Sequence, residues 1–202
     1  YSRLSRRLRV LNLDSFSSYY QLLQSDNGEE LVHFINAVTT NLTSFFREPH
    51  HFKLLSETLL PYLMTKKIAT RRIRIWSAGC ASGEEAYSIA IVIKETIPPD
   101  WDVKILATDL DSSVLAKAME GVYEVDKMTT ISSERLFRWF KKGTKQQPGL
   151  VQVVPELQYL ITFKRVNLIK PGPLIGLLIL FFVATSSFTS TKRRKKFYLI
   201  AS

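Results

Sequence analysis

A short glycine-containing loop holds the residues of this sequence that are best placed to do chemistry. The loop, 77–83, follows an apolar run that ends at Trp76, and two carboxylates, Glu84 and Glu85, open the helical pattern after it. Glycines let a ligand approach the backbone closely, and the first turn of a helix offers free N–H groups. A strand, a loop and a helix in this order therefore predict a site for a nucleotide-like ligand.

A further acid follows the next predicted strand. Residues 103–108 are expected to form a buried strand, and Asp109 stands at its carboxyl end, where an acid can accept hydrogen bonds from both ribose hydroxyls. The loop does not have the glycine spacing of dinucleotide enzymes, and Asp109 follows it by more than their gap of about 20 residues. Carboxylates at the loop would repel a pyrophosphate but attract an ammonium or sulfonium group. These features favour S-adenosylmethionine as the ligand.

Simpler interpretations of the same residues stay open. Gly79 and Gly83 could serve only a tight turn, and the two glutamates could be first-turn acids that face the helix dipole. Cys80 is expected to fill space in the loop rather than to act as a nucleophile. The three histidines lack the neighbouring cysteines or acids of a metal site, so no metal is predicted.

Composition limits the classes of protein to which the chain could belong. Its 202 residues, 46% of them hydrophobic, are enough for one good core with a small appended domain. A single cysteine suits a reducing cytoplasm. The net charge is +10, but half of it comes from residues 192–196, and the aromatic residues are not interleaved with the basic clusters. Nucleic acid is therefore not expected as a partner.

The periodicity predicts a chain that alternates helices and strands. Helical spacing is expected over 4–23, with a start signal at Asp14-Ser15, and again over 29–40, 50–64, 86–97, 114–119 and 132–140. Asp111 is a predicted N-cap. Alternating apolar residues over 150–154, followed by 157–163, predict a small antiparallel excursion.

The segment between the second and third predicted helices permits two interpretations. It reads Asn-Leu-Thr-Ser-Phe-Phe-Arg over 41–47. In the simpler one, Phe45 and Phe46 pack in the core and Arg47 is solvated. In the other, Asn41, Thr43 and Arg47 lie at the rim of a ligand site.

Taken together, these segments resemble the chemotaxis receptor methyltransferases, the CheR family of protein-glutamate O-methyltransferases. The matching blocks are TTNLTSFFREPHHF (39–52), RIWSAGCASGEEAYSIA (74–90), ILATDLDSSVLAKA (105–118) with GVY (121–123), and FKRVNL (163–168). They occur in the order and at the spacing of the family, and the resemblance covers about residues 1–172.

The resemblance implies an α/β fold: a Rossmann-like S-adenosylmethionine-dependent methyltransferase domain with a small antiparallel β insert, preceded by a partial helical N-terminal domain. The implied divisions are a helical remnant over 1–22, a linker helix over 23–40 and the methyltransferase domain over 41–173. The insert, at about 143–163, corresponds to the family's receptor-docking subdomain.

The resemblance also implies site residues, each carried over by its place in a matching block. The positions expected to contact S-adenosylmethionine are Asn41, Thr43, Arg47, Glu85, Asp109, Asn167 and Leu168. Arg47 is in addition the expected catalytic residue, orienting a carboxylate near the reacting methyl group. A glutamate side chain is already anionic at neutral pH, so methyl transfer needs alignment more than a general base.

The implied function is methyl transfer to glutamate side chains on the cytoplasmic domain of a chemotaxis receptor. We expect a cytoplasmic monomer that associates with membrane receptors and has no membrane span of its own. The arginines of the first helix would face the acidic receptor helices, or would form a solvated basic face. The alternative is a catalytically inactive fragment that binds the receptor only through the β insert.

The residues after Pro173 depart from the family. A strand with a Cys-Arg-Asn motif and an aromatic run is implied there, but the sequence has an apolar run, 174–184, and a basic tail. The run is shorter than the about 20 residues of a membrane helix. Shifting the codon frame from Phe182 can recover Cys-Arg-Asn-Val-Val-Ile-Tyr-Phe-Asp-Lys. We therefore expect 174–202 to be an aberrant, out-of-frame tail. The parallel sheet would then have about three strands, and we expect weak cofactor binding and marginal stability.

Overall fold

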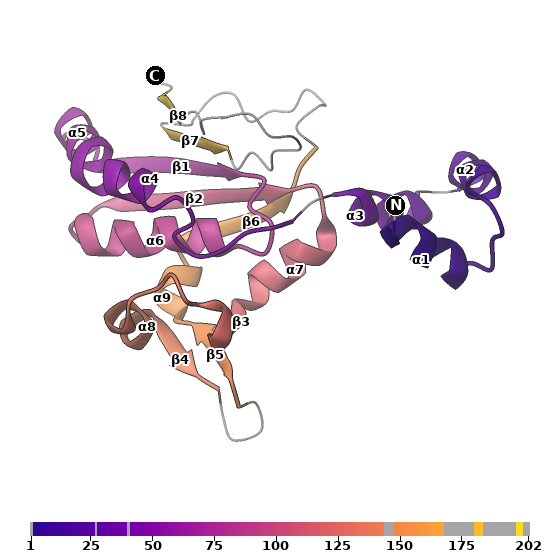
Figure 1. Ribbon diagram of the computed structural model, residues 1–202. Helices are drawn as coiled ribbons and strands as arrows, with labels where there is room; N and C mark the ends of the chain where they lie inside the picture. The colour runs from indigo at the N-terminus through magenta and orange to yellow at the C-terminus, as the bar shows by residue number, and fades with distance from the viewer. Residues whose placement is uncertain are drawn as a thin grey trace.

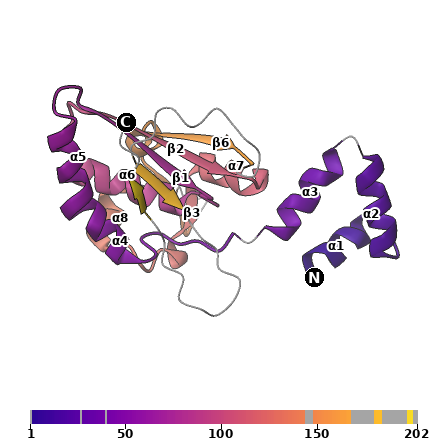
Figure 2. The ribbon, with the colours of Figure 1, turned by 90° about the horizontal axis from the view of Figure 1, so that it is seen from above.

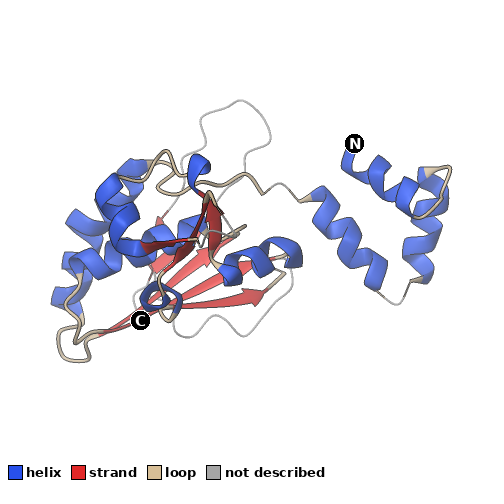
Figure 3. Ribbon diagram, turned by 90° about the horizontal axis from the view of Figure 1, so that it is seen from below, coloured by secondary structure: helices blue, strands red, loops and turns tan. Residues whose placement is uncertain are grey.

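The computed structural model describes residues 2–26, 28–39, 41–143, 148–167, 180–183 and 197–199. Three helices begin the chain: α1 (Ser2–Val10), α2 (Phe16–Ser25) and α3 (Glu29–Val38). The predicted start at Ser15 is confirmed, because its hydroxyl accepts the N–H of Ser18 and caps α2. Helices α1 and α2 both pack on α3. The three form a unit that stands apart from the strands and is joined to them by one linker (Figures 2 and 3).

One buried acid holds the three helices together. Glu30, only 6% exposed, accepts two hydrogen bonds from the Arg7 guanidinium, at 2.8 and 2.5 Å, and one from the Tyr19 hydroxyl at 2.7 Å. The hydrogen bond from Arg7 holds the pKa of Glu30 below its usual value, although burial opposes it. Each of the three helices contributes one member of this cluster, so its ion pair links α1 to α3 and its hydroxyl links α2 to α3.

Replacing Arg7 with alanine should therefore destabilise the helical unit by about 2 kcal/mol at neutral pH, since charge-assisted hydrogen bonds to a buried carboxylate are lost. The lowered pKa of Glu30 means that this stabilisation is present above the unfolded pKa of glutamate and is lost as the pH falls through the folded value. Urea denaturation at pH 7 and pH 3 measures both effects. Arg6→Ala, at an exposed position of the same helix, is the control, and equal losses for the two variants would contradict the prediction.

A long helical segment follows the linker. It consists of α4 (Pro49–Leu54), a π-helical turn η1 (Leu55–Leu59) and α5 (Leu60–Lys66), close to the helix predicted over 50–64. Pro49 lies at the start of α4, where a missing N–H costs least, whereas Pro61 lies directly after the π-helical turn, within the continuous helical segment. Both α4 and η1 pack against α6 (Glu84–Thr96), the helix after the glycine loop.

The main sheet contains the strands that precede and follow α6 in the sequence. Strands β1 (Arg72–Ala78), β2 (Asp102–Asp109) and β6 (Ile161–Arg165) are parallel neighbours, with α6 and α7 (Ser112–Glu120) as connections. The order across the sheet is β6-β2-β1-β7-β8 (Figure 1). The predicted N-cap at Asp111 is confirmed. The α/β class with parallel strands is thus as predicted.

Strand β2, predicted as a buried strand, has most of its buried side chains on one face, with Thr108 at its end the buried residue of the other face. Val103, Ile105 and Ala107 are buried in the main core, but Lys104 is exposed and Leu106 is half-buried. Alternate side chains of a strand point to opposite faces, and among the described residues α6 and α7 pack against the face that carries the buried set. The strand therefore has the one-sided burial more usual of antiparallel sheets.

The parallel part of the sheet extends beyond the three strands expected from the sequence. The backbone of β7 (Leu180–Val183) pairs in parallel with Ile75–Ala78 of β1, and β8 (Phe197–Leu199) pairs antiparallel with β7. A stretch rich in aromatic and branched residues has a high β-propensity of its own, so this pairing does not test the reading frame. The frame of 174–202 stays a prediction.

A small antiparallel sheet forms the predicted insert, with limits that differ from those read in the sequence. Its order is β3-β5-β4, from β3 (Val122–Glu124), β5 (Leu150–Val153) and β4 (Phe140–Lys142). The short helices η2 (Val125–Lys127), α8 (Ser133–Trp139) and α9 (Pro155–Gln158) accompany it. The insert was predicted over about 143–163, but its strands begin at Val122, and Ile161–Arg165 belongs to the main sheet. Pairing with β2, not local alternation, decides that assignment.

No helix among the described residues is both long enough and apolar enough to cross a membrane.

Candidate functional site

The parallel strands bring three chain segments to one edge of the main sheet. Strand β1 ends at Ala78, β2 at Asp109 and β6 at Arg165, and the registers pair Ala78 with Thr108 and Asp109 with Arg165. The next parallel strand, β7, lies on the opposite side of β1 from β2. Ligands of open α/β sheets bind at the carboxyl edge where the strand order reverses. The candidate site therefore lies at the end of β1.

The glycine loop is fastened to the end of β2. The N–H groups of Gly79 and Cys80 both donate to the Thr108 carbonyl, at 2.8 and 2.9 Å. Gly83 has φ = +94°, and a Cβ there would lie 2.9 Å from the Cβ of Ala118, so both the turn and the packing require glycine. A tight turn is thus present at Gly83, and it is compatible with a ligand at the loop.

Asp109 faces this loop. Its Oδ2 accepts the N–H of Ala81 at 2.8 Å, and its Oδ1 accepts the N–H of Asp111 at 3.0 Å. An ionised carboxylate offers about four acceptor sites, so each oxygen retains capacity for one further donor. The half-buried side chain is therefore held rigidly at the mouth of the loop with acceptor capacity for a diol.

Two more carboxylates occupy the first turn of α6. Glu85 is buried and accepts a hydrogen bond from the Ser77 hydroxyl at 2.8 Å. Glu84 accepts the Ser82 hydroxyl, and burial raises its pKa although that hydrogen bond opposes the shift. Burial, Asp109 and Glu85 also raise the pKa of Cys80, so its thiol stays protonated. The loop is thus lined with carboxyl groups, which in their ionised form suit a cationic ligand and not a phosphate.

The segment 41–47 crosses α6 beside the insert. Phe45 is 2% exposed and its ring meets those of Tyr123 and Phe140 edge-on, at 4.8 and 5.4 Å between centroids. Phe46 is also buried, and its N–H donates to the Ser88 hydroxyl of α6 at 3.0 Å. The interpretation that both phenylalanines pack in the core is confirmed. They anchor a segment whose polar side chains lie nearer the solvent.

Those polar side chains occupy different positions. Arg47 is exposed, and its guanidinium donates to the Leu42 carbonyl at 2.8 Å, which keeps it on the loop of Asn41 and Thr43. Thr43 is half-buried. Asn41 turns toward the end of β2, where its amide donates to Asp111 at 2.6 Å.

The last of the predicted site residues follow β6. The N–H of Val166 donates to the Asp109 carbonyl at 3.0 Å, which places half-buried Asn167 beside the end of β2. Leu168 lies outside the described residues. The end of β2 thus brings together Asp109, Asn167 and Asn41, the last by its hydrogen bond to Asp111. Arg47 is instead held by its own loop.

Two contributors to this geometry were not predicted as site residues. Asp111 was expected only to cap a helix, and Ser77 was placed in the loop without a role of its own, yet they orient Asn41 and Glu85. A buried serine at the end of a strand, eight residues before a buried acid, is too weak a sequence signal to reveal such a contact.

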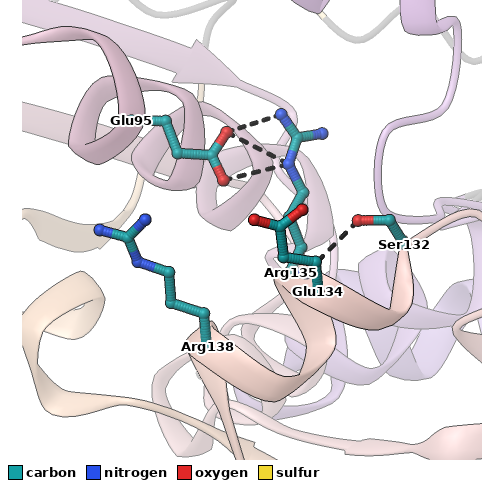
Figure 4. Close-up of a pocket in the computed structure, with 5 residues that line it drawn as sticks. All are labelled: Glu95, Ser132, Glu134, Arg135 and Arg138. Carbon is teal, nitrogen blue, oxygen red and sulfur yellow. Dashed lines mark hydrogen bonds and ion pairs between the residues drawn. The ribbon is translucent and has the colours of Figure 1, made fainter.

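A surface pocket of about 340 Å³ lies elsewhere, at the far end of α6 (Figure 4). It is lined by Glu95, Ser132, Glu134, Arg135 and Arg138. The guanidinium of Arg135 is paired with Glu95 and lies over the Phe46 ring. Glu95 follows Glu84 by eleven positions in the helix, about 16 Å at the usual rise. Because its charges balance and it is remote from the glycine loop, the pocket is not part of the candidate site. In the part of the chain that the structure describes, no acid, histidine or cysteine cluster could hold a metal ion.

Comparison with known proteins identifies the family. A family model described as the SAM binding domain of CheR methyltransferase matches residues 41–195, and one described as its all-alpha domain matches residues 1–39. The chain belongs to the CheR methyltransferase family. The two CheR matches meet at the linker between the helical unit and the main sheet.

Relatives with this name are similar over most of the chain. It is 44% identical over 171 residues to chemotaxis protein methyltransferase 2 of Pseudomonas aeruginosa, covering 84% of this chain and 59% of that protein. It is 43% and 41% identical over 185 residues to the chemotaxis protein methyltransferases of Salmonella typhimurium and Escherichia coli, covering 86% of this chain and 60% of each. The chain thus spans about 60% of the length of these relatives.

The CheR match makes S-adenosylmethionine the expected cofactor. The donor set fits it: Asp109 retains acceptor capacity for ribose hydroxyls, and the acids of the loop suit a cationic amino group or sulfonium.

Proposed function

We propose that this chain binds S-adenosylmethionine at the end of β1 and transfers its methyl group to glutamate side chains of a chemotaxis receptor. The observation that carries the proposal is Asp109, a carboxylate fixed by the Ala81 N–H at the mouth of an acidic glycine loop. The CheR match and the names of the relatives support the same conclusion.

Each predicted residue that the structure describes has a role that its position permits. Asp109 would accept the ribose hydroxyls, and Glu85 would contribute negative charge toward the cationic part of the ligand. Asn41, Thr43 and Asn167 would contact the cofactor from the segments on either side of the end of β2. Leu168 is assigned to the same set by the family motif alone.

The reaction asks little acid–base chemistry of the protein. Bound S-adenosylmethionine supplies an electrophilic methyl group. The substrate glutamate, with a pKa near 4.3, is already an anion at neutral pH, so no residue has to remove a proton. The chain's task is alignment and charge placement. Arg47, exposed and held by the Leu42 carbonyl, is the cation that would orient the incoming carboxylate.

The proposed substrate is the cytoplasmic domain of a methyl-accepting chemotaxis receptor, since the relatives are named chemotaxis methyltransferases. We further propose a cytoplasmic monomer that meets its receptors at the membrane surface. Nucleic acid is not proposed as a substrate, because half of the net positive charge lies in residues 192–196.

A second candidate function is receptor binding without catalysis. The strands of the small sheet, β3-β5-β4, all lie among the described residues, and Phe140, Val151 and Val153 are buried within it. The insert could therefore keep a docking role even if the cofactor site were incomplete. Capture of a receptor fragment without methyl transfer would favour this role.

The first experiment is calorimetric titration of S-adenosylmethionine into this 202-residue chain and into a version with the tail restored to the other frame. We expect binding by both, weaker in the present chain, and labelled methyl transfer to a receptor cytoplasmic fragment by the restored form. Absence of binding in both would contradict the proposed function. Equal binding would contradict the out-of-frame tail, which sequencing of the encoding DNA tests directly.

A further inference from the structure

The carboxylate of Asp111, which is 1% exposed, has its two oxygens committed to different parts of the molecule. Oδ1 caps α7, accepting the N–H groups of Ser113 and Val114 at 2.8 and 3.3 Å and the Ser113 hydroxyl at 2.6 Å. Oδ2 faces the linker and accepts the Thr39 hydroxyl at 3.0 Å and the Asn41 amide at 2.6 Å. Only the first set is explained by helix capping.

The linker is held from its other side as well. The Arg3 guanidinium of α1 donates to the Thr39 carbonyl at 2.6 Å, and the Asn36 amide of α3 lies 3.3 Å from the Ser112 hydroxyl of α7. The path from the helical unit to the end of β2 therefore runs through Thr39 and ends on Asp111.

The charge on Asp111 is maintained by these same contacts. Burial would raise its pKa, but the hydrogen bonds from Ser113, Thr39 and Asn41 hold the pKa below its usual value. Two residues earlier, Asp109 accepts the N–H of Asp111 and holds the glycine loop through Ala81. The turn at the end of β2 thus holds the glycine loop through Asp109 and the linker through Asp111.

We propose that Asp111 is a positioning residue that fastens the linker, through Thr39 and Asn41, to the end of β2 and orients the Asn41 side chain toward the cofactor site. It does not touch the cofactor itself. The fastening of the linker follows from the contacts alone. The consequence for cofactor affinity rests on the proposed function.

Asp111→Asn tests the fastening, because asparagine is as good an N-cap as aspartate. With its oxygen on the cap, its amide faces the linker. The charge-assisted hydrogen bonds from Thr39 and Asn41 are then lost, and only a neutral bond to a rotated Asn41 amide or to the Thr39 hydroxyl can replace them, while α7 stays capped. We expect thermolysin to cut before exposed Leu42 at least about tenfold faster than in the parent chain, the size expected for losing a charge-assisted hydrogen bond. Hydrogen exchange in the first turn of α7 should change by less than about threefold.

Two hydroxyl deletions on the same carboxylate form a matched pair. Thr39→Val removes a donor on the linker side, and Ser113→Ala removes one on the cap side. We expect faster cleavage at Leu42 for the first and parental cleavage for the second. Parental cleavage in both Asp111→Asn and Thr39→Val would overturn the proposal, as would equal acceleration by Ser113→Ala, which would indicate general destabilisation. If Asp111→Asn fails to fold, the hydroxyl pair decides the question.

The effect on cofactor affinity is measured in a separate experiment. S-adenosylmethionine affinity, measured by calorimetry, should fall about tenfold in Asp111→Asn and stay within about twofold of the parent in Ser113→Ala. Faster cleavage with unchanged affinity would overturn the orienting role of Asp111 toward Asn41. A parent chain that binds no S-adenosylmethionine would count against the proposed function and leave the cleavage result as the test of the fastening.

Discussion

Asp109→Ala should weaken S-adenosylmethionine binding by roughly one to two orders of magnitude, the loss expected when charge-assisted hydrogen bonds to both ribose hydroxyls are removed. In the structure each Asp109 oxygen already accepts one backbone N–H, from Ala81 and from Asp111. The alanine variant therefore also loosens the glycine loop, which adds to the loss. Calorimetric titration measures the change in affinity.

A ligand without ribose hydroxyls separates the two contributions. An S-adenosylhomocysteine analogue that lacks the 2′ and 3′ hydroxyls should bind the parent chain weakly and should lose affinity on Asp109→Ala only to the extent that the loop is loosened. Asp109→Asn, which keeps one acceptor oxygen, should fall between the parent and the alanine variant. Losses of equal size for both ligands would contradict a ribose-binding role.

Arg47→Ala is expected to lower the rate of methyl transfer by roughly two to three orders of magnitude while changing cofactor affinity far less. The reason is that alignment of the anionic substrate, rather than proton removal, limits such a reaction. Arg47→Lys should recover only part of the rate, since an ammonium keeps the charge but not the planar fork that matches a carboxylate. The assay is transfer of a labelled methyl group to a receptor cytoplasmic fragment.

Controls make the effect of Arg47 specific. Arg138→Ala removes another exposed arginine, at the pocket beyond the far end of α6, and should leave the rate unchanged. The rate is measured in this chain and in the version with the restored tail, so that low activity in one does not hide the effect. A rate within about fivefold of the parent for Arg47→Ala would show that Arg47 is not the catalytic cation.

The local parts of the fold were predictable because their signals lie within a few residues of each other. The run from Ile73 to Glu85 predicted a strand, a glycine loop and a helix, and β1 and α6 form there. The caps at Ser15 and Asp111 were also predictable, since a capping side chain bonds N–H groups two or three residues ahead. The family motifs added the expected site residues, which stay predictions.

Contacts between distant segments were not predictable from such patterns. Arg7 and Glu30 are 23 residues apart, and Asn41 and Asp111 are 70 apart. Nothing in the spacing of either pair marks them as partners, because periodicity reports which face of an element is apolar and not which element covers it. Asp111 could therefore be identified as a helix cap, but its hold on the linker could not.

Strand membership shows the same limit. Residues 157–163 alternate like part of a hairpin, yet Ile161–Arg165 pairs in parallel with β2, and Leu180–Val183 adds a fourth parallel strand beside β1. A strand's neighbours are set by backbone hydrogen bonds to segments that are far away in the sequence. Local composition predicts that such a segment is extended. The strand with which it pairs determines whether it belongs to the insert or to the main sheet beside the candidate site.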